Sequence, residues 1–235
     1  MYSAGIDRLT HQPLSFSVSE TTEGVHIHII DAELMGKGEK EKKDLYIEGV
    51  QNNGIINHYE YIINSEGTIE IRHVLKPEGK MPLWFPRIGL TLTVSDALDQ
   101  VKWYGRGPQE NYPDRKTGYP TGIYASTVQA MYEPYLMPQD YGLRTDVRWL
   151  QLTTDKGIGL QFKMNEWFNF NIYPYSTDNL TKAMYTYQLQ KQKGMTLNLD
   201  YATTGVGCTA RGVFGAYKAM PQEYRRTISI KPMMK

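Results

Sequence analysis

The sequence lacks several features that would assign a protein to a class at once. It contains a single cysteine, Cys208, so no disulfide can form within the chain. No histidine stands beside that cysteine, and we therefore expect a buried small residue rather than a nucleophile. No apolar run reaches the roughly 18 residues of a membrane span, and no signal peptide is recognisable.

Strong charge of either sign is also missing. The formal net charge of the 235 residues is +1, and no basic run departs from this balance. Neither a nucleic acid nor a membrane is therefore expected as a partner. Nothing in the composition calls for a cofactor, and the compartment stays open between cytoplasm and periplasm.

Tyrosine, by contrast, is abundant, with 18 residues beside 4 tryptophans and 6 phenylalanines. Tyrosine and tryptophan suit sugar binding, because an aromatic face packs on C–H bonds and the polar tip adds a hydrogen bond. The same residues are also common at the ends of strands in large β-proteins. Composition alone leaves both explanations open.

Short alternating segments separated by turn residues indicate an all-β protein. Strands are predicted at residues 15–18, 25–30, 45–50, 55–63, 68–75, 87–94, 101–104, 147–153, 159–164, 165–174, 195–202 and 227–231. Residues 31–44 are expected to be a charged connection, and residues 176–183 one or two helical turns behind a Ser or Thr cap. Residues 114–138 show little periodicity and predict a long ordered loop. The predicted fold class is a large antiparallel β-sandwich in one domain.

Two histidines, His26 and His28, share one face of a predicted strand, because side chains alternate along a strand. Such a pair can bind a metal ion. No third ligand stands near them in the sequence, so an ordinary polar face is the favoured interpretation and no metal is predicted.

The stretch Val101–Arg115 begins as an aromatic strand and stops at Gly105, Gly107 and Pro108. A polar cluster follows, made of Gln109, Glu110, Asn111, Tyr112, Asp114 and Arg115. Two interpretations stay open. The cluster is either a structural loop in which Arg106 and Arg115 pair with Glu110 and Asp114, or a loop that carries function.

Three motifs in this part of the chain resemble a known family. They are Trp103-Tyr104-Gly105-Arg106-Gly107-Pro108-Gln109-Glu110-Asn111-Tyr112-Pro113-Asp114-Arg115, Pro86-Arg87-Ile88-Gly89-Leu90, and Tyr135-Leu136-Met137-Pro138-Gln139-Asp140-Tyr141-Gly142-Leu143-Arg144. The first closely resembles the signature of the C-terminal domain of family 2 β-galactosidases, often called the small chain. The similarity keeps its order and spacing from about Ala4 to the C-terminus.

The resemblance implies a large twisted β-sandwich of the galactose-mutarotase-like kind, spanning residues 1–235 as one domain that lacks its first strand. It also implies a parent enzyme that hydrolyses terminal β-galactosides, in which this domain walls the sugar pocket and braces the catalytic barrel. The expected partners are the other domains of the same polypeptide and a carbohydrate. Because the family's catalytic glutamates lie in the barrel, no catalytic residue is expected here.

The candidates for lining the pocket or binding carbohydrate are the polar and aromatic residues of these motifs and one phenylalanine near the C-terminus. They are Arg87, Trp103, Glu110, Asn111, Tyr112, Asp114, Arg115, Asp140, Arg144 and Phe214. Seven of them, Arg87, Glu110, Asn111, Asp114, Arg115, Asp140 and Arg144, are expected to converge in one hydrogen-bonded network, since charged groups are cheaper to bury paired than singly.

Phe214 is included because of a departure from the family. Members commonly carry Gly-Gly-Asp-Asp-Ser-Trp-Gly near the end, with a tryptophan that stacks on the sugar. Residues 205–214 here lack that tryptophan and the paired aspartates. In an alignment without gaps, Gly212 stands at the position of this tryptophan. Phe214 can take the place of the tryptophan only if the loop is two residues longer here than in the family.

Two further functions remain as alternatives. An aldose epimerase of the resembled fold uses a His acid and a Glu base, but the five histidines all lie between residues 11 and 73, outside the motifs. A carbohydrate-binding module needs an exposed aromatic platform, for which the candidates are Trp103, Tyr104, Tyr112, Trp149 and Trp167.

Two last expectations follow from the sequence. Trp84, Phe85, Tyr132 and Tyr135 have no obvious core partner and are predicted to form an exposed apolar patch. The chain alone is predicted not to hydrolyse a β-galactoside, because arginines beside Glu110 and Asp114 would lower the pKa of both carboxyl groups and leave no proton donor.

Overall fold

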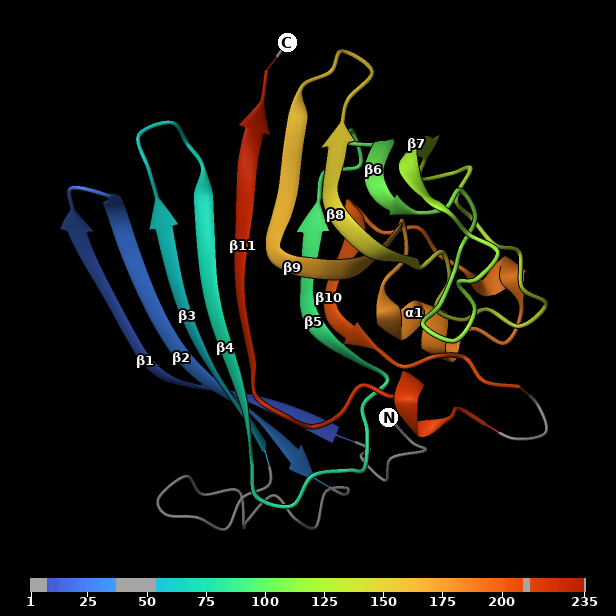
Figure 1. The fold of residues 1–235 in the computed structure, drawn as a ribbon, viewed down its shortest axis with the longest axis horizontal. Coiled ribbons are helices and arrows are strands. Elements are labelled where there is room, and N and C mark those ends of the chain that lie inside the picture. Colours follow the sequence, from blue (N-terminus) through green and yellow to red (C-terminus); the bar gives the residue numbers. More distant parts are fainter. Residues whose placement is uncertain (1–7, 37–53, 209–211, 235) are drawn as a thin grey trace. The chain divides into compact units, whose positions relative to one another are not determined.

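The computed structural model describes residues 8–36, 54–208 and 212–234, which consist mainly of β-strands (Figure 1). The chain divides into two compact units. Unit 1 comprises Met1–Pro86 and Lys218–Ile230, and unit 2 comprises Arg87–Tyr217 and Lys231–Lys235. The strand pairs within each unit are antiparallel, so the predicted all-β antiparallel class is confirmed. In the part of the chain that the structure describes, no helix is long and apolar enough to cross a membrane.

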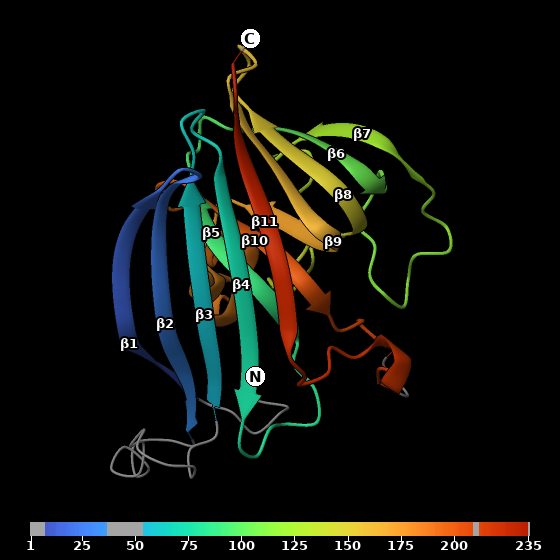
Figure 2. The same ribbon diagram turned by 60° about the vertical axis from the view of Figure 1, so that its left-hand side comes forward.

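Unit 1 is a sheet of long strands that follow one another in the order β1-β2-β3-β4-β11 (Figure 2). Its strands are β1 (Arg8–Thr21), β2 (Gly24–Gly36), β3 (Gly54–Ile63), β4 (Ile69–Glu78) and β11 (Tyr224–Met233). The predicted turns at residues 22–24 and 64–67 are confirmed. Gly24 and Gly67 hold the positive φ values of 138° and 74° that these turns require.

Two predictions for unit 1 are wrong at their boundaries. Residues 31–36 were expected in a charged connection, but β2 continues through them, with Asp31 opposite Asn57 of β3. β1 begins at Arg8 and passes a register shift between Pro13 and Ser15. β2 pairs with both β1 and β3, and this pairing offsets the low strand propensity of its polar last part. The strand predicted at 45–50 lies outside the described residues.

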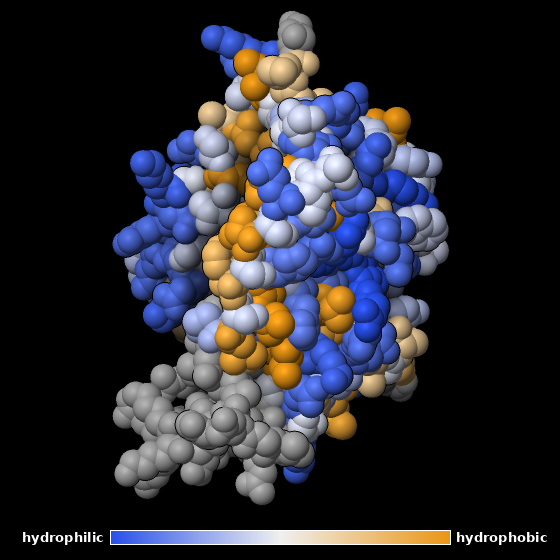
Figure 3. All heavy atoms as spheres, turned by 90° about the vertical axis from the view of Figure 1, so that its left-hand side faces the viewer, coloured by the Kyte–Doolittle hydropathy of each residue, from blue (hydrophilic) through white to orange (hydrophobic). Residues whose placement is uncertain are grey.

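One edge of unit 1 leaves apolar side chains uncovered. Phe16 and Val18 alternate along β1 on one face and are exposed, as are Leu14 at the register shift of β1 and Val25 of β2. Figure 3 views the molecule from the side on which β1 lies in Figure 1, and hydrophobic residues interrupt the hydrophilic surface there. The core of unit 1 is built from the buried side chains of Ile55, Ile62, Ile71, Leu75, Phe85, Tyr224 and Ile228.

Unit 2 has the strand order β7-β6-β8-β9-β10-β5. Its strands are β5 (Arg87–Val94), β6 (Gln100–Arg106), β7 (Thr121–Thr127), β8 (Arg144–Thr153), β9 (Gly159–Tyr173) and β10 (Met195–Thr203). The predicted hairpin turn at Thr154–Gly157 is confirmed, with the amide of Gly157 donating to the carbonyl of Thr154. The predicted helical turns form α1 (Thr177–Lys182), whose N-cap Ser176 accepts from the amide of Asn179.

Two features of unit 2 differ from prediction. β9 is one strand where two were predicted, because β8 pairs along its residues 159–170 and β10 pairs with its residues 169–173. β7 lies inside the stretch expected to be a loop. It is an edge strand that pairs only with β6, and most of its residues are partly exposed, which explains the weak pattern.

Trp103 is the centre of the core of unit 2. It is 0% exposed, lies edge-on to Phe170, and donates its indole N–H to the carbonyl of Arg106 at 2.9 Å. Val101, Trp103 and Gly105 alternate inward along β6 while Tyr104 points outward. Trp103 therefore positions the loop that follows β6, but it offers no exposed face to a sugar.

Candidate functional site

The loop after β6 leaves the strand through two glycines that tolerate no side chain. A Cβ on Gly105 would lie 2.8 Å from the Val147 side chain, and one on Gly107 would lie 2.8 Å from the Tyr124 ring. Contacts this close do not occur between real Cβ atoms and their neighbours. The two glycines thus allow the backbone to pack closely against its neighbours, so that the polar segment from Gln109 to Arg115 begins next to the core.

Glu110 binds neutral donors from three directions. Its carboxylate accepts the amide of Gly142 at 2.8 Å, the hydroxyl of Tyr112 at 3.3 Å and the hydroxyl of Tyr135. Burial raises the pKa of both tyrosines, and the neighbouring Glu110 carboxylate raises it further. Both phenols therefore remain protonated donors, and Glu110 serves to tie the loop after β6 to the segment that precedes β8.

Asn111 ties the same two segments together from within the protein. It is fully buried, and its side-chain oxygen accepts both the amide and the hydroxyl of Thr145, at 3.1 and 2.5 Å. Its side-chain nitrogen donates to the carbonyl of Gln109, and its own amide donates to the carbonyl of Leu143. Both polar atoms of the Asn111 side chain therefore have partners, as a buried amide requires.

Arg144 is a buried cation held mainly by neutral groups. Its guanidinium donates to the carbonyl of Gly142 at 2.9 Å and lies 5.3 Å from the centroid of the Trp103 ring. Burial lowers its pKa to about 10, although Glu110 and Glu133 act in the opposite direction. Within the described ranges no carboxylate forms a direct ion pair with it, and its Nε has no hydrogen-bond partner.

Arg87, in contrast, pairs with two carboxylates. It lies 3.0 Å from Asp200 and 3.3 Å from Asp140, and Asn171 donates to Asp140 at 2.9 Å. Asp200 also accepts the hydroxyl of Thr203 at 3.1 Å. Burial raises the pKa of Asp200 to about 6 against the attraction of Arg87.

The sequence analysis did not include Asp200 or Asn171 among the candidates. A signal was available for the first, since Asp200 is an acid in the largely apolar strand that runs from Met195 to Ala202. An acid at such a position predicts a buried partner of opposite charge.

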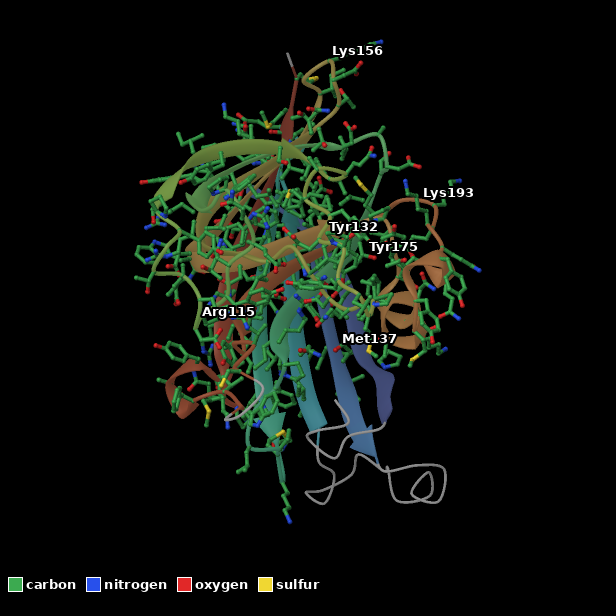
Figure 4. The ribbon with its side chains drawn as sticks, turned by 90° about the vertical axis from the view of Figure 1, so that its right-hand side faces the viewer. Arg115, Tyr132, Met137, Lys156, Tyr175 and Lys193 are labelled. Atoms are coloured by element: carbon green, nitrogen blue, oxygen red, sulfur yellow. The ribbon has the colours of Figure 1, made fainter. Side chains whose placement is uncertain are left out.

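Asp114 and Arg115 hold a different segment, the one that follows β10. Asp114 accepts the amides of Val206 and Gly207, at 3.1 and 2.7 Å, and Arg115 donates to the carbonyl of Gly207 at 3.2 Å. A Cβ on Gly205 would lie 2.4 Å from the Asp114 carboxyl carbon. Figure 4 shows Arg115 beside this part of the chain.

Several described residues of the connection from β10 to β11 are apolar and exposed. Phe214 is 65% exposed, and Val206, Tyr217 and Met220 are exposed as well. Cys208 is also exposed, so the expectation of a buried cysteine is wrong. The structure thus fastens the start of the connection to the loop after β6 while leaving its apolar side chains available.

The proposed ion pairs within the loop after β6 do not form. Arg106 instead pairs with Asp146 at 2.5 Å and donates to the carbonyls of Lys116 and Tyr119. Arg115 binds a carbonyl, as described above. Glu110 and Asp114 instead bind amides or phenols.

The seven polar residues expected in one network form three adjoining groups. Arg87 and Asp140 form the first. Glu110, Asn111 and Arg144 form the second, around residues 142–145. Asp114 and Arg115 form the third, around residues 205–207. The prediction holds in part, because the residues gather where β6, β8 and β10 meet their loops without one continuous chain of bonds.

The aromatic platform needed for a binding module is mostly absent among its candidates. Trp103 and Tyr112 are buried, and Trp149 is half-buried. Trp167 is 59% exposed, but the guanidinium of Arg148 lies over its ring at 4.0 Å and also over Tyr104. A cation therefore already occupies one face of each exposed candidate ring.

The four aromatic residues predicted to form an exposed apolar patch are all at least partly buried. Phe85 is buried, while Trp84, Tyr132 and Tyr135 are half-buried. Tyr132 and Tyr135 pack against the buried cluster of Tyr141, Tyr173 and Leu180, and Tyr132 and Tyr175 lie together in Figure 4. The exposed apolar residues are their neighbours in sequence, namely Leu83, Leu136 and Met137.

Comparison with known proteins agrees with these motifs. Residues 8–230 match the family model described as "Beta galactosidase small chain". A protein named "Beta-galactosidase" from Priestia megaterium (strain DSM 319 / IMG 1521) is 38% identical over 147 residues, which cover 63% of this chain and 14% of the relative. The "Beta-galactosidase" of Vibrio cholerae serotype O1 is 31% identical over 207 residues, which cover 88% of this chain and 18% of the relative.

These alignments span less than a fifth of each of the two relatives. Among solved structures, the chain is similar to a "GalM/aldose Epimerase Homologue from C. elegans". The TM-score is 0.46 at 12% identity, and the match covers 94% of this chain and 69% of that one.

Proposed function

The chain belongs to the β-galactosidase small-chain family, and we propose that it serves as the C-terminal domain of a family 2 glycoside hydrolase. In this proposal the parent enzyme hydrolyses terminal β-galactosides. The domain, residues 1–235, lines one side of the sugar pocket and braces the catalytic barrel. Its partners are the other domains of the same polypeptide and the carbohydrate.

One observation carries the proposal, namely the way in which the connection from β10 to β11 is held. Asp114 and Arg115 bind the backbone of Val206 and Gly207, which fastens the connection to the family-like motif after β6. Phe214, further along the connection, keeps most of its ring exposed. An exposed aromatic ring on a segment that is hydrogen-bonded to the scaffold is suited to pack against the C–H face of a sugar.

The domain does not supply the catalytic groups in this proposal. Retaining glycoside hydrolysis needs two carboxyl groups about 5 Å apart, one of them a proton donor. Glu110 faces Tyr135 and Gly142, whereas Asp114 faces the amides of residues 206 and 207. Each carboxylate is thus occupied by scaffold donors from a different segment, so the isolated chain should hydrolyse a chromogenic β-galactoside at the buffer rate.

A chimeric enzyme tests the pocket-lining role. This chain would replace the matching segment of the Priestia megaterium β-galactosidase, and hydrolysis of a chromogenic β-galactoside would be measured. We expect an active chimera in which Phe214→Ala raises KM roughly three- to tenfold, the loss of about one aromatic contact, with a smaller change in kcat.

Ile158→Ala provides the matched control, because Ile158 is an exposed apolar residue on the hairpin between β8 and β9. It should leave KM unchanged. An active chimera whose KM is the same with phenylalanine or alanine at position 214 would contradict the pocket-lining role. Activity of the isolated chain that disappears in Glu110→Gln would contradict the assignment of catalysis to another domain.

The two alternatives keep less support from the structure. An aldose epimerase needs a histidine acid, and unit 2, which carries the family-like motifs, contains no histidine. A carbohydrate-binding module needs an open aromatic platform, and Arg148 covers the most exposed candidate. Following the anomers of galactose by NMR, with and without the chain, separates the epimerase from a domain that has no chemistry of its own.

A further inference from the structure

The sheet of unit 1 brings three potential metal ligands together on one face. His26 and His28 lie on β2 and point to the same side because side chains alternate along a strand. Strand β3 lies beside β2 (Figure 1), and its Glu60 is directly opposite His28 in the register. No third ligand stands near the two histidines in the sequence. Strand pairing supplies one in the folded chain, namely Glu60.

The distances are close to those that a metal ion requires. His26 Nδ1 lies 3.0 Å and His28 Nε2 lies 3.8 Å from the same oxygen, Glu60 Oε1. The three ligand atoms all lie within 4.8 Å of one another. A tetrahedral ion with bonds of about 2.0–2.1 Å keeps its ligand atoms roughly 3.3 Å apart, so small side-chain rotations are enough to close the site.

The hydrogen-bond partners of His26 are compatible with metal binding at Nδ1. The hydroxyl of Thr21 lies 2.9 Å from His26 Nε2 and accepts the amide of Glu23. His26 Nδ1 lies 3.0 Å from the Glu60 carboxylate. When Nδ1 binds a metal ion, Nε2 carries the ring proton and can donate it to the Thr21 hydroxyl, which orients the ring.

The second oxygen of Glu60 has a different partner, which orients the carboxylate. Arg72 lies 3.0 Å from Glu60 Oε2 and 2.8 Å from Glu70. Glu70 balances the charge of Arg72, so the guanidinium holds Glu60 in place without making the site strongly positive. Hydrogen-bonded groups that orient ligands in this way are typical of metal sites in proteins.

We propose that His26, His28 and Glu60 bind one divalent transition-metal ion, with zinc as the best match to two imidazoles and one carboxylate. The site is open on one side, since the side chain of His28 is about half exposed, and water would complete a tetrahedral shell. The ion would link β2 to β3 and stabilise the folded sheet of unit 1 by binding only the folded state.

Isothermal titration calorimetry of the full chain with ZnCl₂, after treatment with a chelator, tests the proposal. We expect one ion per chain and a rise in the unfolding temperature on binding. His28→Gln and Glu60→Gln should each weaken binding by about 100-fold, and Thr21→Val, which removes the orienting hydroxyl, by about 10-fold. The visible spectrum of the Co²⁺ form should lose its intensity in the same order.

Two variants serve as controls for adventitious zinc binding. His58→Gln removes another exposed histidine of β3, and Cys208→Ser removes the exposed thiol. Both should bind zinc as the unchanged chain does. Absence of saturable binding in the unchanged chain would overturn the proposal. So would binding that survives in Glu60→Gln and His28→Gln, or binding that is lost in either control.

Discussion

The two units bury polar side chains in opposite ways. In unit 1, Asn57 donates to Asp31 at 2.8 Å and lies 3.1 Å from the ring of His73, and burial lowers the pKa of that histidine to about 4. In unit 2, Arg87 lies between Asp140 and Asp200, and burial raises the pKa of Asp200 to about 6. At this position unit 1 thus keeps His73 neutral, whereas unit 2 brings an arginine and a carboxylate into the protein together.

The difference predicts opposite responses to acid. Between pH 6.5 and about 4 the folded state holds fewer protons on His73 than the unfolded state does, so stability from this group is lost as the pH falls. Between pH 6 and 3.8 the folded state holds more protons on Asp200, so the cost of burying this carboxyl group falls with the pH. Acid therefore destabilises unit 1 by protonating the buried His73. In unit 2 acid protonates Asp200 and removes its charge from the ion pair with Arg87.

The largest effect is expected from breaking the ion pair of unit 2. Arg87→Gln leaves Asp200, whose side chain is 2% exposed, without a cation, and should lower the free energy of unfolding by about 3–5 kcal/mol. Urea denaturation followed by circular dichroism measures the change. In Asp200→Asn the same arginine substitution should cost clearly less, and equal costs in both backgrounds would show that the pair is not the cause.

A smaller effect is expected from acid acting on unit 1. Between pH 7 and 4.5 His73 should cost about 2–3 kcal/mol of stability, from the difference between the pKa values of the unfolded and folded chain. His73→Gln keeps a donor for Asn57 but does not titrate. Between pH 7 and 4.5 the free energy of unfolding of this variant should therefore fall by about 2–3 kcal/mol less than that of the unchanged chain. Parallel urea titrations at the two pH values decide the point, and an identical acid loss in both proteins would refute it.

The contact between Asp114 and the connection after β10 should be sensitive to one methyl group. Gly205→Ala places a Cβ against the Asp114 carboxylate and should cost about 1–3 kcal/mol through overpacking. Gly215→Ala, in the same connection, has open space around its Cβ and is the matched control. It should be neutral or slightly stabilising by thermal denaturation, and equal destabilisation by both substitutions would argue against a specific contact at residue 205.

The smallest effect is expected from an ion pair at the surface. Lys182 and Asp178 lie 2.8 Å apart on α1, four residues from each other, but both side chains are more than two-thirds exposed. Water screens such a pair, so Lys182→Ala should change the free energy of unfolding by less than about 0.5 kcal/mol. A loss of stability as large as that caused by Arg87→Gln would show that burial does not explain why the two ion pairs contribute differently to stability.

Local rules account for the features that were predicted correctly. The turn at Thr154–Gly157, the cap at Ser176 and the strand alternation around Trp103 each depend on a few neighbouring residues. The partners of charged side chains depend on much more. Arg106 was assigned to neighbouring acids but pairs with Asp146, 40 residues away, because its side chain leaves β6 toward β8.

By itself, the sequence of this protein determined its all-β class, most of its turns and the motifs of its family, because alternation and turn chemistry act over a few residues of backbone. Only the tertiary structure decided that Arg87 meets Asp200, that Glu110 binds Tyr135, and that Glu60 joins two histidines. These pairings depend on strand register and on loops that bring distant residues together. Several acids and arginines compete for each partner, and burial in the folded chain selects among them.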